Sequence, residues 1–167
     1  MFERRSSLTG LNAFAAVANA ALPEREPHGP AYDGGEALLG MIAEHDFSDW
    51  APLFVRWELG LLDELGFGLD LSRCAASGLT ENLIYVSPRS GRAVSADSGE
   101  PYRDRLLALP AFLRLGAHEA RAADILSGLQ LTAHFLEQWV LAPHGRNMPE
   151  ARQRLSEMAA RQARESA

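Results

Sequence analysis

The sequence predicts a mainly α-helical domain, a helical bundle that carries one small β-hairpin as an insertion. Three observations predict it: apolar residues recur at three- and four-residue spacing through most of the chain, one short β-type run interrupts them, and 167 residues suit a single compact domain. We expect the first half of the bundle over residues 1–70, the hairpin insertion over 71–100 and the second half over 101–167.

The first half should contain three helices, over residues 8–22, 33–45 and 50–65. Pro23 ends the first helix, and the proline-rich linker 23–30 should be extended. Asp33 is the expected N-cap of the second helix, and Ser48 or Asp49 that of the third. The third helix is apolar around most of its circumference, which predicts a place at the centre of the bundle.

The second half follows the hairpin, whose strands are expected over residues 83–86 and 92–95 around a turn at 88–91. Short helical turns broken by Pro110 should fill residues 102–115, and a long helix should span 119–141. A last helix should begin at Pro149 and end near residue 163. His134, alone on the long helix, is predicted to be a buried or half-buried histidine with one hydrogen-bond partner.

Composition and charge argue against several classes of function. All sixteen basic residues are arginine, so lysine Schiff-base chemistry and a P-loop lysine are excluded. Glycine-rich nucleotide loops, the H-E-x-x-H metal motif and the G-x-S-x-G nucleophile motif are absent, and we expect no enzyme. The net charge of −6 argues against a protein that binds nucleic-acid phosphates over its whole surface. The sequence shows neither an apolar run of about 20 residues nor a secretory leader, which predicts a cytoplasmic protein with no membrane partner.

Two residue pairs with C-x-x-C-like spacing flank the hairpin. They are Cys74 with Ser77 and Ser95 with Ser98. This is the layout of a four-ligand zinc knuckle in which serine occupies three positions. Because serine hydroxyls are not structural zinc ligands, the segment is predicted to be a degenerate knuckle without metal.

Arg56 interrupts the apolar third helix, and it has two interpretations. It can form an internal ion pair with Glu58, Asp63 or a carboxylate of another helix. Alternatively, it can anchor an acidic peptide end beside an apolar groove, in which case Arg103 and Arg105 are weaker candidates for the same role.

Other arginines cluster where they could contact DNA. One group is Arg89 with Arg92 in the hairpin, and the other lies on the last helix, at Arg152, Arg154, Arg161 and Arg164. For the last helix the alternative is a solvated face, in which Glu150 pairs with Arg154 and Glu157 with Arg161.

The central block, V-R-W-E-L-G-L-L-D-E-L-G-F-G-L-D-L-S-R-C-A-A-S-G over residues 55–78, resembles the signature stretch of the bacterial RecO family. The hairpin over residues 85–95 is similar too, as are residues 22–28, 132–136 and 149–152. The resemblance covers the helical and knuckle portion of RecO, without the N-terminal OB-fold of that family. Some members carry two C-x-x-C pairs that bind zinc at these positions, of which only Cys74 matches here.

The resemblance implies a non-enzymatic recombination mediator in DNA repair. Members of the family work with RecR and bind the acidic C-terminal tail of single-stranded DNA-binding protein. A direct role in binding and annealing single-stranded DNA is the alternative. Because the DNA-binding surface of the family is expected to lie largely on the OB-fold, this chain alone should bind DNA weakly at best.

Overall fold

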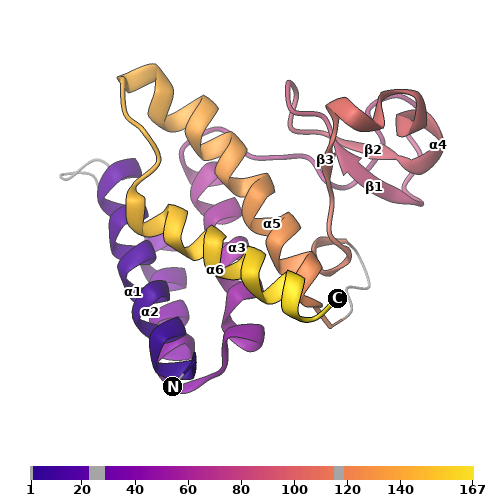
Figure 1. Ribbon diagram of the computed structural model, residues 1–167. Helices are drawn as coiled ribbons and strands as arrows, with labels where there is room; N and C mark the ends of the chain where they lie inside the picture. Colours follow the sequence, from indigo (N-terminus) through magenta and orange to yellow (C-terminus); the bar gives the residue numbers. More distant parts are fainter. Residues whose placement is uncertain (1, 23–28, 115–118) are drawn as a thin grey trace.

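The computed structural model describes residues 2–22, 29–114 and 119–167 of the chain. Five helices build the bundle: α1 (Phe2–Ala21), α2 (Gly29–Glu44), α3 (Phe47–Glu64), α5 (Ala122–Phe135) and α6 (Glu150–Glu165). As Figure 1 shows, α1 lies between α2 and α6, while α3 packs against both α2 and α5. The predicted mainly α-helical class, with a small inserted hairpin, is confirmed. None of the described helices is long and apolar enough to span a membrane.

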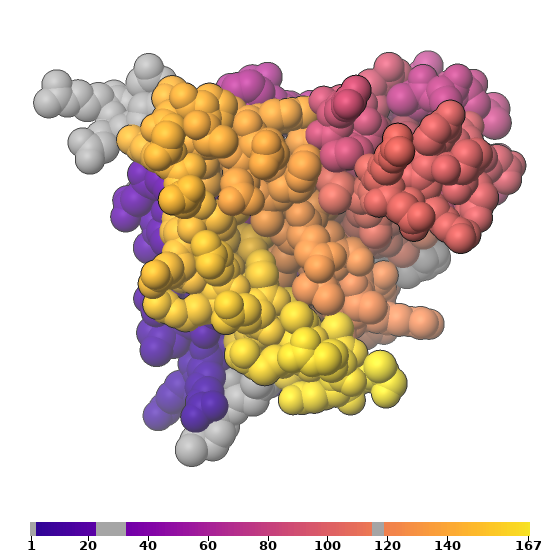
Figure 2. Space-filling view, turned by 45° about the horizontal axis from the view of Figure 1, so that its top comes forward, coloured from indigo at the N-terminus to yellow at the C-terminus, as the bar shows by residue number. Residues whose placement is uncertain are grey.

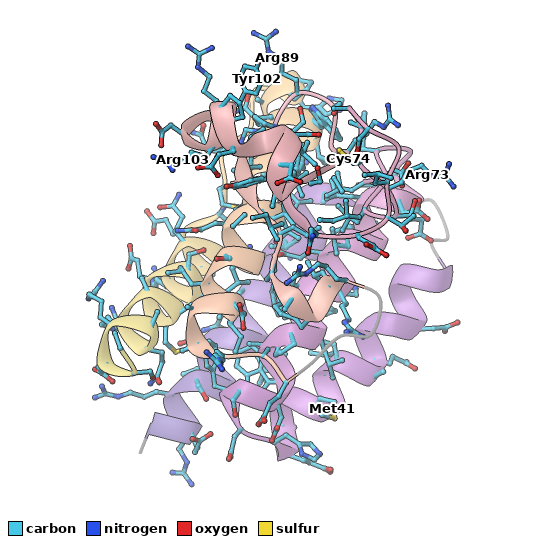
Figure 3. The ribbon with its side chains drawn as sticks, turned by 90° about the vertical axis from the view of Figure 1, so that its right-hand side faces the viewer. Met41, Arg73, Cys74, Arg89, Tyr102 and Arg103 are labelled. Atoms are coloured by element: carbon cyan, nitrogen blue, oxygen red, sulfur yellow. The ribbon has the colours of Figure 1, made fainter. Side chains whose placement is uncertain are left out.

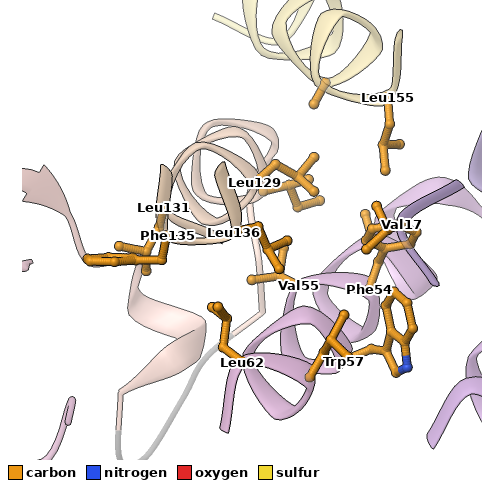
Figure 4. Close-up of a cluster of buried hydrophobic side chains, with 14 of the residues drawn as sticks. Val17, Phe54, Val55, Trp57, Leu62, Leu129, Leu131, Phe135, Leu136 and Leu155 are labelled. Carbon is orange, nitrogen blue, oxygen red and sulfur yellow. The ribbon is translucent and has the colours of Figure 1, made fainter. Parts of the chain in front are cut away.

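Helix α3 forms the centre of the bundle, as its apolar circumference predicts. Trp50, Phe54 and Leu61 are fully buried, and Figure 4 shows α3 side chains meeting those of α1, α5 and α6 in one cluster. Burying each large apolar side chain stabilises the fold by roughly 1.5–3 kcal/mol. Gly66 ends the helix in a left-handed conformation, φ 91°, and the Phe67 N–H donates to the Leu62 carbonyl at 2.8 Å.

Three helices begin earlier than predicted, and in α1 and α3 the added residues make contacts that local periodicity does not show. In α1, the Ser7 hydroxyl donates to the Ile42 carbonyl of α2 at 3.0 Å, and Ser6 is fully buried. In α3, Asp46 rather than Ser48 or Asp49 is the N-cap, since Phe47 is buried edge-on against Trp50 at 5.1 Å. Helix α2 begins at Gly29, so the end of the predicted extended linker is helical; residues 23–28 lie outside the described part.

The predicted hairpin is present as β1 (Leu83–Val86) and β2 (Ala93–Ser95), paired antiparallel. A third strand, β3 (Leu107–Ala108), was not predicted; it pairs antiparallel with β1, giving the order β2-β1-β3. The connection between β2 and β3 contains α4 (Ala96–Gly99) and the 3-10 helix η1 (Glu100–Arg105). We call residues 71–108 the knuckle. Figure 2 shows the knuckle as a lobe beside α5 at one corner of the bundle.

Past the knuckle, the chain departs from regular α-helix in two places. A 3-10 turn, η2 (Ala111–Leu113), follows Pro110, in partial agreement with the predicted broken turns. The predicted long helix is α-helical only to Phe135; it continues as a π-helix, η3 (Leu136–Leu141), and then as the 3-10 turn η4 (Ala142–His144). His134 is half-buried and its Nε2 lies 3.2 Å from the Pro88 carbonyl, which confirms the structural role predicted for it.

Candidate functional site

A surface groove lies where the ends of α1 and α3 meet η3 and η4. Its volume is about 700 Å³. The side chains that line it are mostly apolar: Asn19, Ala20, Ala21, Leu22, Leu65, Phe67, Gln138, Trp139, Val140, Pro143, His144 and Arg146. We call it the α1–η3 groove. Volumes of this order are typical of sites for small ligands or short peptide ends.

Two aromatic side chains form one wall of the α1–η3 groove. Trp139 is half-buried, and its ring centroid lies 4.5 Å from that of Phe135 and 6.2 Å from that of Phe67. Phe67 is 40% exposed, although it lies only three residues after the end of the buried helix α3. The π-helical turn presents Gln138, Trp139 and Val140 to the groove. Such turns are rare and are frequent at functional sites.

An arginine side chain, Arg146, lies at the edge of the α1–η3 groove. The turn after η4 uses Gly145 at φ 67°, and it brings Arg146 back toward α1. Arg146 Nη1 donates to the Ala20 carbonyl at 2.7 Å, while the side chain stays exposed. His144 lines the same groove. Sequence reasoning missed Arg146; the only local signal was the Pro143–Gly145 turn, which indicates a chain reversal but not its destination.

Arg56 lies elsewhere on the bundle. It is exposed, and its Nη2 donates to the Phe112 carbonyl of η2 at 2.7 Å. Among the ion-pair partners predicted for Arg56, Glu58 is wrong, because Glu58 is fully buried and bound to Arg152. Arg103 and Arg105 are exposed on η1 of the knuckle, and Arg103 Nη1 lies 2.8 Å from Glu100 Oε1. The predicted partner-binding arginines therefore lie apart: Arg56 contacts η2, while Arg103 and Arg105 belong to the knuckle.

Arg152 was predicted to contact DNA, and the structure corrects this placement. Its side chain is fully buried on α6. Nε and Nη2 donate to the two Glu58 carboxylate oxygens at 2.7 and 2.9 Å, Nη2 also donates to the Leu129 carbonyl at 2.8 Å, and Nη1 donates to Ser156 Oγ at 2.6 Å. The Thr132 hydroxyl donates to Glu58 Oε1 at 2.6 Å. The Arg152 guanidinium is therefore buried and bonded within the bundle, and it is not available to contact DNA.

The local sequence already contains an indication that Arg152 is buried. Arg152 precedes the buried Leu155 by three residues and Ala159 by seven, so it lies on the apolar face of α6. Arg154, Arg161 and Arg164 lie on the exposed part of the helix. Arg154 Nη2 is 3.4 Å from Glu150 Oε2, which is the predicted surface pair.

The remaining predicted DNA-contacting residues belong to the hairpin. Arg89 lies in the turn between β1 and β2, and Arg92 follows that turn; both are exposed. Figure 3 shows Arg89 at the same end of the knuckle as Tyr102, with Arg103 farther down its side.

The degenerate knuckle brings Cys74 and Ser95 together. The Ser95 N–H donates to Cys74 Sγ at 3.2 Å, and Cys74 Sγ lies 3.6 Å from Ser95 Oγ. Burial raises the pKa of the Cys74 thiol, but hydrogen bonds from Ser77 and Ser95 outweigh burial and lower the pKa to about 5. Within residues 2–22, 29–114 and 119–167, no group of three or more His, Cys, Asp and Glu side chains is placed to hold a metal ion. At these positions the side chains of Ser77 and Ser95 act as hydrogen-bonding groups.

Comparison with known proteins agrees with these features. Residues 3–147 match the family model described as recombination protein O C terminal. The chain is 55% identical over 152 residues to the DNA repair protein RecO of Phenylobacterium zucineum, 51% identical over 152 residues to that of Caulobacter vibrioides and 51% identical over 161 residues to that of Rhodospirillum rubrum.

These alignments take in 91–94% of the chain but only 62–64% of each relative's length. No solved structure matches the chain. The family match reaches from the start of α1 through the knuckle to Arg146 at the edge of the groove. The resemblance drawn from the central block is thereby confirmed, and the chain belongs to the RecO family of DNA repair proteins, to whose C-terminal part it corresponds.

Proposed function

We propose that this chain is a non-enzymatic scaffold of DNA repair and recombination, which docks the acidic C-terminal tail of single-stranded DNA-binding protein and works with RecR. Family membership supports the repair role, because the relatives carry the name DNA repair protein RecO. The observation that carries the docking proposal is the α1–η3 groove, an apolar, aromatic-walled depression with an arginine at its edge.

The groove suits a peptide that is acidic and ends in an aromatic residue. The aromatic ring would lie against Phe67 and Trp139, where burial of apolar surface supplies the attraction. The terminal carboxylate would reach Arg146, whose guanidinium holds one carbonyl and has further N–H donors to offer. A net charge of −6 makes such local cations decisive, because the chain as a whole repels an acidic peptide.

Arg56 supplies a matched control for this assignment. Like Arg146, it is exposed and donates to one backbone carbonyl at 2.7 Å, so alanine removes the same charge and the same hydrogen bond at either site. The test measures binding of a fluorescein-labelled acidic peptide ending in phenylalanine by fluorescence anisotropy. Arg146→Ala should weaken binding about tenfold or more, as loss of a charge-assisted contact does. Arg56→Ala should change it little.

Two further arms test the groove itself. Phe67→Ala should weaken binding, since this ring is 40% exposed and its loss leaves the bundle core intact. A peptide with an amidated C-terminus should bind the unmodified chain as weakly as the normal peptide binds Arg146→Ala. If Arg56→Ala is the damaging change, the anchor lies beside η2; if neither substitution weakens binding, the anchor assigned to the α1–η3 groove is refuted. If the unmodified chain does not bind the peptide, docking of an acidic tail by this chain is refuted.

A second candidate function is direct binding of single-stranded DNA by the knuckle. The knuckle holds five arginines and four carboxylates, a net charge of +1 in a chain whose total is −6. Its exposed Arg89 and Arg92 are available to phosphates. Binding that falls with rising salt would support this candidate, and binding that is absent at moderate ionic strength would remove it.

A further inference from the structure

An exposed aromatic side chain lies among the arginines of the knuckle. Tyr102 is 59% exposed and belongs to the 3-10 helix η1, where Arg103 and Arg105 follow it. The start of η1 is held against the sheet, because Gly99, the last residue of α4 and the N-cap of η1, approaches the Tyr85 ring so closely that an added Cβ would lie 2.4 Å from it. The phenol is thus displayed on a fixed support.

The strand pairing brings Tyr102 and the hairpin turn to the same end of the sheet. Val86 pairs with Leu107 in the antiparallel β1–β3 ladder and with Ala93 in the β1–β2 ladder. The turn that follows Val86 carries Arg89, and η1 ends at Arg105, two residues before Leu107, so both leave the sheet at this end. In the view of Figure 3, Arg89 and Tyr102 lie at this end of the knuckle, and Arg103 lies farther down its side.

The charges at this end favour a phosphate chain locally. Arg89 and Arg105 are exposed, while Arg103 is already paired with Glu100 at 2.8 Å. Asp104 lies between Arg103 and Arg105 in sequence and is exposed, so it offsets part of the positive charge. The combination of an aromatic face with flanking guanidinium groups is the one that proteins use to hold unpaired bases and their phosphates.

We infer that Tyr102 is a stacking platform for one base of a single-stranded nucleic acid, with Arg89 and Arg105 contacting the adjacent phosphates. This inference rests on the second candidate function and names a contact residue for it. A single strand is the fitting ligand because stacking on an exposed phenol requires a base face that a duplex keeps covered.

The experiment measures binding of the full chain to a labelled oligothymidylate of about 12 nucleotides, and to an abasic strand with the same number of phosphates, over a series of salt concentrations. Tyr102→Leu should weaken oligothymidylate binding about fivefold or more, without changing the salt slope. Tyr102→Phe should bind normally. The abasic strand should bind the unmodified chain and Tyr102→Leu equally.

Charge variants report the phosphate contacts separately. Arg89→Ala should reduce the slope of log K against log salt by about 0.7, the value for one lost single-strand phosphate contact. Asp104→Asn should tighten binding, because it removes a repulsive charge. Arg5→Ala, an exposed arginine on α1, is the matched control and should change neither the affinity nor the slope.

The outcomes distinguish the proposals. If Tyr102→Leu binds oligothymidylate as the unmodified chain does, or if the abasic strand binds equally well, stacking on Tyr102 is refuted while direct binding survives. Tighter binding of a duplex than of the single strand also overturns it. If the unmodified chain binds no single strand, this inference and the second candidate function both fail, and peptide docking in the α1–η3 groove is unaffected.

Discussion

The buried pair of Glu58 and Arg152 gives the sharpest test of how α3, α5 and α6 are held together. Both side chains are fully buried, and two hydrogen bonds of 2.7 and 2.9 Å join them. Arg152→Met removes the guanidinium and leaves the Glu58 carboxylate with the Thr132 hydroxyl donor. Breaking one side of a buried pair costs about 3–5 kcal/mol, which for a domain of this size lowers Tm by roughly 6–20 °C.

The matched control lies two residues along the same helix. Arg154→Met removes an arginine whose carboxylate partner is 3.4 Å away at the surface, and we expect a change within about 0.5 kcal/mol. The comparison separates the effect of the buried pair from the effect of placing methionine in α6. Urea unfolding followed by far-ultraviolet circular dichroism measures both variants.

A second substitution should rescue the first. In Glu58→Met/Arg152→Met no charge is left uncompensated, and Thr132 still donates to the Gly128 carbonyl at 3.2 Å. The double variant should therefore be about 2 kcal/mol more stable than either single variant, a strongly non-additive cycle. If Arg152→Met lies within 1 kcal/mol of the unmodified chain, or if the two single losses simply add, the buried pair does not carry the charge compensation that we assign to it.

The remaining predictions concern the knuckle and its neighbouring turns. The folded-state pKa of the Cys74 thiol is about 5, below the usual thiol pKa, so the thiolate stabilises the folded state. Its contribution to the free energy of unfolding is fully present at pH values above the usual thiol pKa and is lost as the pH falls through about 5. Cys74→Ser should abolish this pH-dependent part of the unfolding free energy, and a thiolate absorbance that titrates at the usual thiol pKa in the folded chain would contradict the shift. Gly91→Ala should destabilise more than Gly145→Ala: both residues have positive φ, 69° and 67°, which costs alanine about 1 kcal/mol. Only at Gly91 would the added Cβ also lie 2.7 Å from Leu69 and 2.8 Å from Trp139, overpacking worth about 1–3 kcal/mol more, and equal losses in thermal unfolding would show that this contact relaxes freely.

Local patterns account for what the sequence predicted well. The apolar circumference of α3 predicted its central place, and a short run of β-type residues followed by turn residues predicted the strands at Leu83 and Ala93. The spacing of Cys74 and Ser95 about the hairpin predicted that they share one small knuckle, and they contact each other. Each of these depends on residues close in sequence, or on one short turn, so local propensity and periodicity were enough.

Contacts between distant segments decided the rest. Strand β3 is two residues long and exists because β1 offers it an edge, so no period could reveal it. The α1–η3 groove needs Phe67, Trp139 and Arg146 to meet at the end of α1.

The sequence by itself determined the helical class, the hairpin and the family of this chain. Only the tertiary structure decided that Arg146 reaches the α1–η3 groove and which carboxylate the buried Arg152 pairs with, because an arginine's role depends on the groups that the fold brings to it. For Arg152 that carboxylate is Glu58, 94 residues away, and the pairing follows from how α3 and α6 pack, which no local pattern encodes.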